Sequence, residues 1–486
     1  MRPRQGGIAA VATVFNTPIA PYQSNGLTGA RTSNRAVACS VWACASSIED
    51  RPLTTLLLRG VLVGGLSGLL FGFDTAVIAG TTEGIRTAFD LDATGVGITV
   101  SAALWGTLAG ALLAGKPGDR YGARNALKAI AILYCLSGIG CLFAWSWPAL
   151  IAFRVMAGLA VGASSVLAPV YLAEIAPANR RGLMVGTFQL NIVAGILVAY
   201  LSNAIITGFA LGAIDWQVKL GVTALPALLL LAMMFTIPDS PRWLAARGRM
   251  AEAADVLARF GVANPEKELA GYVRADRSAP SPRLSWSRHR KPMLLAFGIA
   301  AFNQLSGINA ILYYLNDIFA AAGYDAVSAD RQAVVIGLCN FAFTALALLV
   351  IDRLGRRTLL LIGSVGLTAT LGGTAAVFLS GQGEQYLLWL LIGFIAFFAF
   401  SQGAVIWVYI SEIFPTDVRA RGQSLGSSTH WFMDAIIAMA FPLVAAQTRG
   451  GPFVVFAVMM AVQFVVVFLF FPETKRRSLE AIEASV

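Results

Sequence analysis

Two charged side chains, Asp74 and Arg154, lie inside long apolar runs and are the first candidates for chemistry. A charged side chain in the hydrocarbon region of a membrane is costly unless it is paired. We therefore expect both residues to face the interior of a helical bundle and to form an ion pair. The carboxylate could take up a proton when the pair opens. The alternative is a structural pair that only fixes the packing of two helices.

Uncharged amides in the apolar runs form a second group of candidate residues. An amide side chain both donates and accepts hydrogen bonds without carrying a charge, which suits a ligand rich in hydroxyl groups. Buried amides also hydrogen bond between membrane helices without any ligand, so each has a purely structural alternative. The amides concerned are Gln189, Asn303, Gln304, Asn309 and Asn340.

His430 and Asp434 form a third candidate group, a second titratable pair. They are four residues apart in an apolar run, so they share one face of a helix. The plainer interpretation is a packed polar pair that fills a cavity. The sharper hypothesis is a titratable site that makes the activity depend on pH, because histidine changes charge near neutral pH.

The composition indicates the environment in which these residues lie. Of 486 residues, 57% are hydrophobic and 13% are charged, whereas a soluble domain has about 25% charged residues. This excludes an ordinary soluble enzyme and a disordered protein. The net charge of +10 fits the Lys and Arg excess of cytoplasmic loops, so we expect a lipid bilayer as partner and no nucleic acid. With two histidines and scattered cysteines, no metal or cofactor is expected.

Twelve apolar runs are long enough to cross a membrane, since a spanning helix needs about 20 residues. The chain therefore predicts an all-α membrane protein with two bundles of six helices. The predicted spans are 56–80, 96–116, 126–146, 149–174, 184–210, 218–237, 292–319, 332–351, 358–380, 386–411, 422–446 and 451–471. The predicted parts are a disordered extension (1–55), a first bundle (56–237), a cytoplasmic linker of amphipathic helices (238–291), a second bundle (292–471) and a cytoplasmic tail (472–486).

The two bundles resemble each other in sequence. The residues 119–122, DRYG, follow the second span, and 352–355, DRLG, follow the eighth. Likewise 173–177, AEIAP, follow the fourth span, and 411–415, SEIFP, follow the tenth. Nearly equal spacings indicate an internal duplication. Parallel six-helix repeats are a known plan of transporters, with the substrate site between the repeats near the membrane midplane.

The distribution of basic residues predicts the orientation. If both termini and the linker are cytoplasmic, the outside loops hold four of the 36 Lys and Arg residues, namely Arg86, Lys219, Arg331 and Arg449. Cytoplasmic loops carry the excess of basic residues, so both termini are expected inside. Glycines also recur at four-residue spacing (Gly64, Gly68 and Gly72; Gly158 and Gly162), which predicts close helix packing.

Several short sequences together resemble one known family. They include PDSPRWL at 238–244, QLSGIN at 304–309, SEIFPTDVRARG at 411–422 and PETK at 472–475. From about residue 56 to 475 the chain resembles the sugar porters of the major facilitator superfamily. It is most similar to bacterial sugar–proton symporters, such as xylose–proton symporters, and also to glucose facilitators.

The resemblance implies roles for particular residues. Asp74 and Arg154 would couple a proton to transport, and Tyr313 and Tyr314 would lie near an outer gate. The residues that would bind substrate are Phe71, Gln189, Asn303, Gln304, Asn309, Asn340, Trp407 and Trp431. Salt bridges that close the cytoplasmic side would involve Arg124, Glu174, Arg181, Arg242, Arg353, Arg356, Arg357, Glu412 and Arg419.

The chain departs from the family pattern in a few places. Asn303 stands where the family usually has Gln, which shortens a side chain in the implied sugar site. Ala404 replaces the proline of a Gly-Pro pair, so a softer helix break is expected there. His430 and Asp434 stand at or near places where the family has neutral amides.

The resemblance implies a secondary active transporter, not an enzyme, that imports a monosaccharide, hexose or pentose, with a proton by alternating access. It would act as a monomer in the bacterial inner membrane. Three alternatives stay open: a passive facilitator, a carrier of another polyol such as inositol, and a membrane sugar sensor without transport. The short tail 472–486 argues against a sensor.

Overall fold

The computed structural model describes residues 54–176, 181–262, 264–276, 284–415 and 418–475. Within these ranges the chain is helical with no strand. Twelve helical segments are long and apolar enough to cross a membrane, so the predicted all-α membrane fold is confirmed. The predicted extension 1–55 falls almost wholly outside the described residues, as does most of the tail 472–486.

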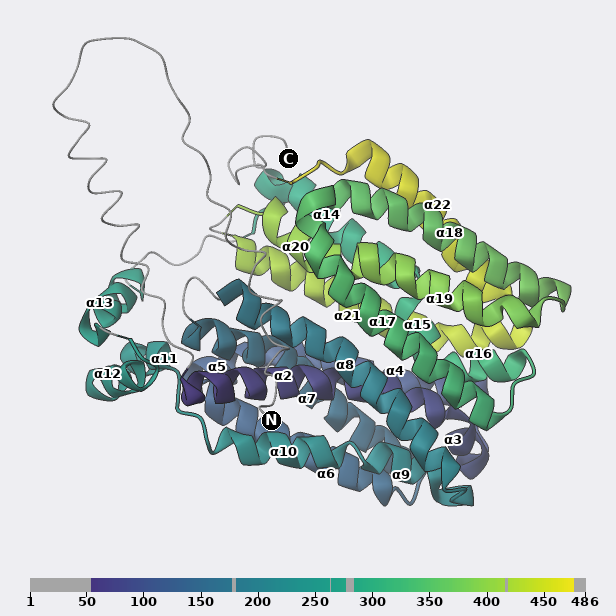
Figure 1. Ribbon diagram of the computed structural model, residues 1–486, viewed down its shortest axis with the longest axis horizontal. Coiled ribbons are helices and arrows are strands. Elements are labelled where there is room, and N and C mark those ends of the chain that lie inside the picture. Colours follow the sequence, from purple (N-terminus) through teal and green to yellow (C-terminus); the bar gives the residue numbers. More distant parts are fainter. Residues whose placement is uncertain (1–53, 177–180, 263, 277–283, 416–417, 476–486) are drawn as a thin grey trace, which may run out of the picture. The chain divides into compact units, whose positions relative to one another are not determined.

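The helices of the chain are labelled in Figure 1. The first half contains α2 (Thr55–Val77), η1 (Ile78–Gly80), α3 (Thr82–Phe89), α4 (Ala93–Leu113), α5 (Gly115–Tyr121), α6 (Ala123–Leu142), α7 (Trp147–Ile175), α8 (Arg181–Gly208), η2 (Gly212–Ile214), α9 (Asp215–Gly221) and α10 (Ala224–Met234). The linker contains α11 (Pro241–Ala246), α12 (Met250–Arg259) and α13 (Pro265–Asp276). The second half contains α14 (Trp286–Leu305), α15 (Ile308–Tyr313), α16 (Leu315–Ala321), α17 (Ala326–Leu354), α18 (Arg356–Ser380), η3 (Glu384–Tyr386), α19 (Leu387–Phe398), η4 (Ala399–Gly403), α20 (Ala404–Ile413), α21 (Arg419–Gln447) and α22 (Gly451–Phe470).

Glycines let the helices of the first half pack backbone to backbone. A Cβ atom on Gly158 of α7 would lie 1.8 Å from the carbonyl oxygen of Ala103 on α4. A Cβ atom on Gly72 of α2 would lie 1.8 Å from the carbonyl oxygen of Ile192 on α8. Side chains larger than hydrogen do not fit at these contacts. The helix pairs α4–α7 and α2–α8 are therefore held at a spacing that only glycine allows.

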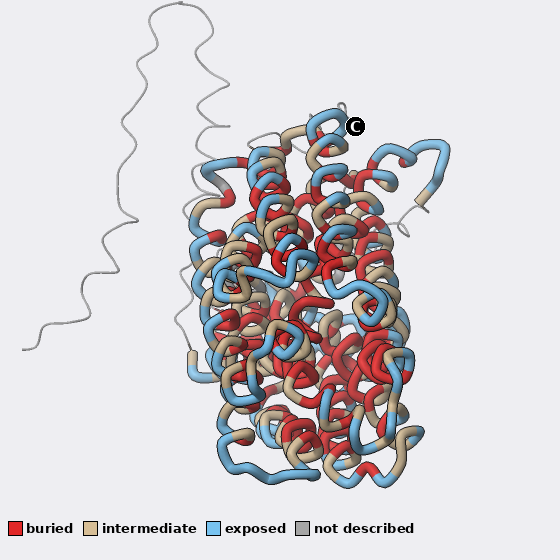
Figure 2. The backbone as a smooth tube through the Cα atoms, turned by 90° about the vertical axis from the view of Figure 1, so that its right-hand side faces the viewer, coloured by how far each residue is buried: buried red, intermediate tan, exposed pale blue. Residues whose placement is uncertain are grey.

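The two halves meet along α4 with α21 and along α8 with α17. Buried residues concentrate where helices face one another, and exposed residues lie on their outer faces (Figure 2). Many of the exposed residues are large and apolar, including Leu113, Leu349 and Phe470. Such an apolar outer surface suits helices that contact lipid.

Two of the interrupted spans lie in the second half. The predicted span 292–319 is broken after α14, where Gly307 has a φ of +80°, a conformation that glycine adopts readily. A Cβ atom at Gly307 would also lie 2.2 Å from the Phe456 ring. In the tenth span, η4 is a π-helical turn between α19 and α20. The break near Ala404 is therefore a π-turn, which needs no proline.

The linker helices α11 to α13 pack on one another and lie beside one end of the spans (Figure 1). We call this end the linker end, and the end that carries α3, α9 and α16 the far end. On α12, Ala253, Val256 and Leu257 are buried, whereas Met250 is 38% exposed. The linker is amphipathic because this buried face packs against α11 and α13.

Candidate functional site

Asp74 and Arg154 form a buried ion pair between two helices of the first half. Arg154 on α7 donates from Nη1 to Oδ1 of Asp74 on α2, at 2.9 Å. The two residues are 6% and 3% exposed. Arg154 Nε has no hydrogen-bond partner in the described part of the chain. The pair neutralises the carboxylate and leaves the Nε–H of Arg154 for a further acceptor, such as water.

A small cavity of about 10 Å³ lies beside this pair and reaches the second half. Asp74, Arg154 and Phe71 line it from the first half, and Tyr313 and Trp431 line it from the second. This volume is about that of one water molecule. Phe71 and Trp431 also contact each other, with ring centroids 5.4 Å apart. Residues implied in proton coupling and residues implied in substrate binding therefore meet at one cavity.

Tyr313 also contacts a second buried carboxylate, Asp434 on α21. The Tyr313 hydroxyl donates to Asp434 Oδ2 at 3.0 Å, and Asn309 Nδ2 donates to the same oxygen at 2.9 Å. Asp434 is 1% exposed, and no Lys or Arg of the described residues pairs with it. Tyr314, the next residue, donates instead to the carbonyl oxygen of Ala438 at 2.8 Å.

His430 lies one turn before Asp434 but contacts a different set of groups. Gln304 Nε2 lies 2.9 and 3.2 Å from the two ring nitrogens of His430. The rings of Trp407 and Trp431 lie 5.2 and 5.0 Å from the His430 ring, centroid to centroid. No hydrogen bond joins His430 to Asp434 among the contacts of the described residues, so each side chain has its own partners.

The remaining predicted amides carry no side-chain hydrogen bond within the described residues. Asn303 and Asn340 are buried, with 3% and 6% exposure, and Gln189 is half-buried. Their amide groups are therefore unpaired within the described part of the chain. No described contact ties Gln189 or Asn340 to the groups around the cavity.

Polar and charged side chains join the two halves at the far end. Thr82 of α3 donates to Asp317 Oδ2 of α16 at 2.7 Å, and Arg86 Nη2 lies 3.5 Å from Asp317 Oδ1. Burial raises the pKa of the Asp317 carboxyl, and the Thr82 hydrogen bond opposes this shift.

A second contact at the far end centres on Lys219 of α9. Its Nζ lies 2.6 Å from Asp215 Oδ2 and 3.7 Å from Asp330 Oδ2 of α17. The side chains of Lys219 and Asp330 are 4% and 3% exposed. Thr207 of α8 also donates to Asp330 at 2.5 Å. The sequence placed Lys219 in an outside loop, but the structure buries it because the two halves close over it.

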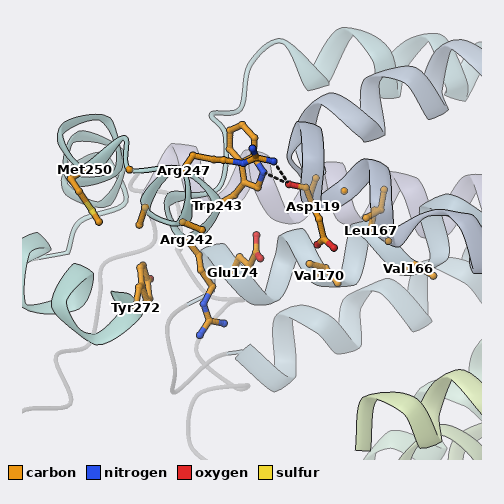
Figure 3. Close-up of a pocket in the computed structure, with 16 residues that line it drawn as sticks. Asp119, Val166, Leu167, Val170, Glu174, Arg242, Trp243, Arg247, Met250 and Tyr272 are labelled. Carbon is orange, nitrogen blue, oxygen red and sulfur yellow. Dashed lines mark hydrogen bonds between the residues drawn. The ribbon is translucent and has the colours of Figure 1, made fainter. Parts of the chain in front are cut away.

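The charged residues of the predicted cytoplasmic gate lie at the linker end, and the contacts described below join residues of the same half or of the linker. Figure 3 shows Glu174 and Arg242 beside a pocket of about 680 Å³ that also contains Asp119. Trp243 Nε1 and Arg247 Nη2 each donate to the carbonyl oxygen of Asp119 at 2.9 Å. These bonds attach the linker helix α11 to the first half.

Other charges of the predicted cytoplasmic gate have partners in the same half. Arg356 donates from Nη2 to Glu412 Oε1 at 2.9 Å, and Arg124 Nη1 lies 3.3 Å from Asp239 Oδ2. The remaining predicted gate residues are Arg353, which is exposed, Arg357, which donates to the carbonyl oxygen of Phe468, Arg419, which is half-buried, and Arg181, whose side chain lies outside the described residues.

The tail motif PETK caps a helix of the second half. Glu473 Oε1 accepts from the backbone N–H of Arg356 at 2.9 Å, and Oε2 accepts from that of Arg357 at 3.1 Å. These are the first N–H groups of α18, which have no partner within the helix. A carboxylate at this place also interacts favourably with the helix dipole.

Residues 61–485 match a family model described as sugar (and other) transporter. The chain belongs to the sugar porter family. The D-xylose-proton symporter of Escherichia coli (strain K12) is 32% identical over 475 residues, which cover 87% of this chain and 94% of that one. The glucose facilitated diffusion protein of Zymomonas mobilis is 35% identical over 472 residues, covering 88% and 97%.

A solved structure of a family member has the same fold. It is the inward-open conformation of the xylose transporter XylE from E. coli, with a TM-score of 0.79 and 28% identity, covering 88% of this chain and 99% of the other. The fold of the major facilitator superfamily, twelve membrane helices in one chain, is thereby confirmed.

Two polar contacts in the present chain were not predicted from its sequence. One is the contact of Lys219 with Asp330, and the other is a buried amide pair in which Gln402 Nε2 donates to Gln463 Oε1 at 2.9 Å. Gln402 and Gln463 are single amides in apolar runs, the same signal that selected the other five. That signal could have found them.

Proposed function

We propose that this sugar porter imports a monosaccharide together with a proton. The main support for this proposal is the Asp74–Arg154 ion pair. The Asp74 carboxylate has no uncompensated negative charge in either of two states, one in which it pairs with Arg154 and one in which it binds a proton. Protonation of Asp74 would release Arg154, and deprotonation would restore the pair. An ion pair that only fixed the helices would not need a neighbouring cavity of water size.

Movement of one proton across the membrane potential supplies enough free energy to accumulate the sugar. One proton moving across about 100 mV supplies about 2.3 kcal/mol. Since each 1.4 kcal/mol is about a factor of ten, this corresponds to roughly 50-fold accumulation.

Two features support this substrate class: unpaired amides within the helical bundle and aromatic rings beside the cavity. Free amides on Asn303, Asn340 and Gln189 can bind sugar hydroxyls, and the Trp431 and Phe71 rings can pack against the apolar face of a pyranose. A xylose–proton symporter among the relatives supports a pentose or hexose. The main competing proposal is passive facilitation of the same sugar, for which the glucose facilitator is a precedent.

The proposed cycle is alternating access in the inner membrane of a bacterium, with both termini and the linker end in the cytoplasm. The far end would then face outside. The Thr82–Asp317 and Lys219–Asp330 contacts join the halves there, which supports an inward-facing state in this structure. Similarity to an inward-open transporter structure supports the same state. The chain is proposed to act as a monomer.

The test is uptake of labelled xylose, glucose, galactose and inositol into transport-null cells, with and without a protonophore. We expect one sugar to accumulate above its outside concentration, and the protonophore to abolish the accumulation. Asp74→Asn should lose accumulation but keep exchange of labelled for unlabelled sugar. Asp255→Asn, an exposed carboxylate on α12, is the control. Uptake that only equilibrates in the unmodified protein would refute symport and favour the facilitator.

A further inference from the structure

The carboxylate of Asp434 is a buried acid that the proposed proton site does not use. Its Oδ2 accepts from two neutral donors, Asn309 and Tyr313, and none of the described Lys or Arg residues pairs with it. Asp74, by contrast, has Arg154 at 2.9 Å. Burying a charged carboxylate without a cation is costly, and binding of a proton would remove that cost at Asp434.

The ionisable groups around Asp434 come from few elements. On its own helix, His430 faces Gln304 and the tryptophans. From α15, Tyr313 is the only ionisable side chain that contacts the carboxylate within the described residues. The helices α4 and α22, which also pack on α21, contain no ionisable residue. The helices α14 and α20 pack on α21 as well. Their ionisable side chains form no hydrogen bond or ion pair with Asp434 within the described residues; they are Arg288, His289, Arg290 and Lys291 on α14, and Tyr409 and Glu412 on α20. Across the cavity beyond Tyr313 lie Asp74 and Arg154.

Tyr313 lies between the two carboxylates. Its hydroxyl donates to Asp434 Oδ2 at 3.0 Å, and Tyr313 lines the cavity that contains Asp74 and Arg154. The cavity has room for about one water, and it is also lined by Arg154, whose Nε has no hydrogen-bond partner within the described residues. A hydroxyl that donates on one side can accept a hydrogen bond from that water on the other.

We propose that Tyr313 and one water relay a proton between Asp74 and Asp434, which makes Asp434 a second proton site inside the sugar pocket. The protonated Asp74 gives its proton to the water, and the water gives one of its own to Tyr313 Oη. Tyr313 then passes its original proton to Asp434. Each O–H bond that breaks is replaced by another, so the net change is one proton moved from Asp74 to Asp434. Asp74 is then free to pair with Arg154 again.

The relay gives a physical reason for coupling. Asp434 shares its Oδ2 with Asn309, an amide of the proposed sugar site. Once protonated, Asp434 becomes a hydrogen-bond donor and no longer carries a charge that the sugar hydroxyls must compensate. The proton and the sugar would then occupy one connected site. This inference rests on the proposed sugar–proton symport and goes further by naming where the proton lies when sugar is bound.

The experiment uses the full chain in proteoliposomes, with labelled sugar uptake and an internal pH dye measured together. The variants are Tyr313→Phe and Asp434→Asn. The control is Tyr314→Phe, because the Tyr314 hydroxyl also donates to α21 but to the Ala438 carbonyl. Exchange of labelled for unlabelled sugar, which needs no net proton movement, reports whether each variant is folded and binds sugar.

We expect Tyr313→Phe to slow sugar-driven proton uptake by roughly tenfold or more, as loss of a proton-transfer group does, and to keep most of the exchange. Asp434→Asn should also flatten the dependence of uptake on pH, whereas Tyr314→Phe should match the unmodified protein. If Tyr313→Phe does not fold, the dependence of sugar uptake on pH in Asp434→Asn tests the relay instead.

Two results would overturn the relay. A proton-to-sugar ratio and pH profile in Tyr313→Phe or Asp434→Asn equal to those of Tyr314→Phe would show that the second carboxylate takes no part. Sugar flux without proton flux in the unmodified protein would refute symport itself, and the relay with it. The two failures are distinguishable because only the second is seen without any substitution.

Discussion

In the proposed transport cycle, Lys219 is expected to hold the far end, the proposed outside, closed in the inward-facing state. It lies on α9 of the first half and approaches Asp330 of the second half at 3.7 Å, with both side chains nearly fully buried. Opening the outside would separate these halves and let water reach Asp330. Lys219→Gln removes the positive charge but keeps a side chain that can donate to the carbonyl oxygen of Gly80, which Lys219 Nζ contacts at 3.0 Å.

The magnitude follows from the geometry of the pair. Two unit charges about 4 Å apart attract by about 4 kcal/mol at an effective dielectric constant of 20. Desolvation of both groups offsets part of this, and Asp330 keeps its hydrogen bonds from Thr207 and Asn316. We expect a net loss of about 2 kcal/mol, which shifts the balance toward the outward-open state by roughly 30-fold.

The assay is labelling by a membrane-impermeant maleimide from outside. Ala329, which is 2% exposed and lines the space between the halves at the far end, is replaced by cysteine to report opening. We expect Lys219→Gln to speed labelling of this cysteine by roughly 30-fold when the closed state dominates. Arg449→Gln is the control, because Arg449 contacts Ala321 of its own half. Equal labelling rates in Lys219→Gln and Arg449→Gln would refute the assignment of Lys219 as an outer contact.

Three further predictions concern packing, pH and the tail. Gly158→Ala should lower the thermal stability by about 1–3 kcal/mol because its Cβ overlaps the Ala103 carbonyl, whereas Gly372→Ala, in open space, should not; equal melting temperatures would contradict this. Burial raises the pKa of Asp317, so the closed outer face binds a proton more readily than the open one. As the outside pH falls through the raised pKa of Asp317, protonation stabilises the closed state, so the cysteine labelling should slow. The effect should be complete below about 3.9, the ordinary pKa of an aspartate, and Asp317→Asn should abolish the dependence on pH. Glu473→Gln should cost about 1 kcal/mol of stability through a weaker helix cap, seen as a lower melting temperature in detergent.

The sequence predicts the number of spans well and their interruptions less well. Twelve apolar runs gave twelve membrane-length helices, because lipid requires long apolar helices whatever the neighbours are. The break at Gly307 was not predicted, because it depends on the Phe456 ring that fills the space beside it. Likewise, the softer break near Ala404 was expected, but a π-turn depends on how the helix packs.

Predicting a contact from sequence succeeds where the cost of leaving a group unpaired requires that contact. The pairing of Asp74 with Arg154 follows from the expense of a single charge in lipid. The contact of Tyr313 with Asp434 does not follow from any local rule, because the two residues are 121 positions apart. The spacing of His430 and Asp434 predicted a shared face, but the groups that each side chain meets come from α14 and α15. Burial of Lys219 depends on closure of two halves, which hydropathy does not encode.

The π-turn η4 has a consequence for the surface that α20 presents. A π-turn holds an additional residue compared with an α-helical turn. Absorbing that residue into a regular helix would rotate all of α20 by about 100° and shift it by about 1.5 Å. Trp407, whose ring centroid lies 5.2 Å from that of His430, would turn away, and a neighbouring residue would take its place. The number of residues in the turn thus decides which face of α20 lies toward His430, so a one-residue deletion within 399–403 would change the side chains beside His430 without altering the sequence of α20.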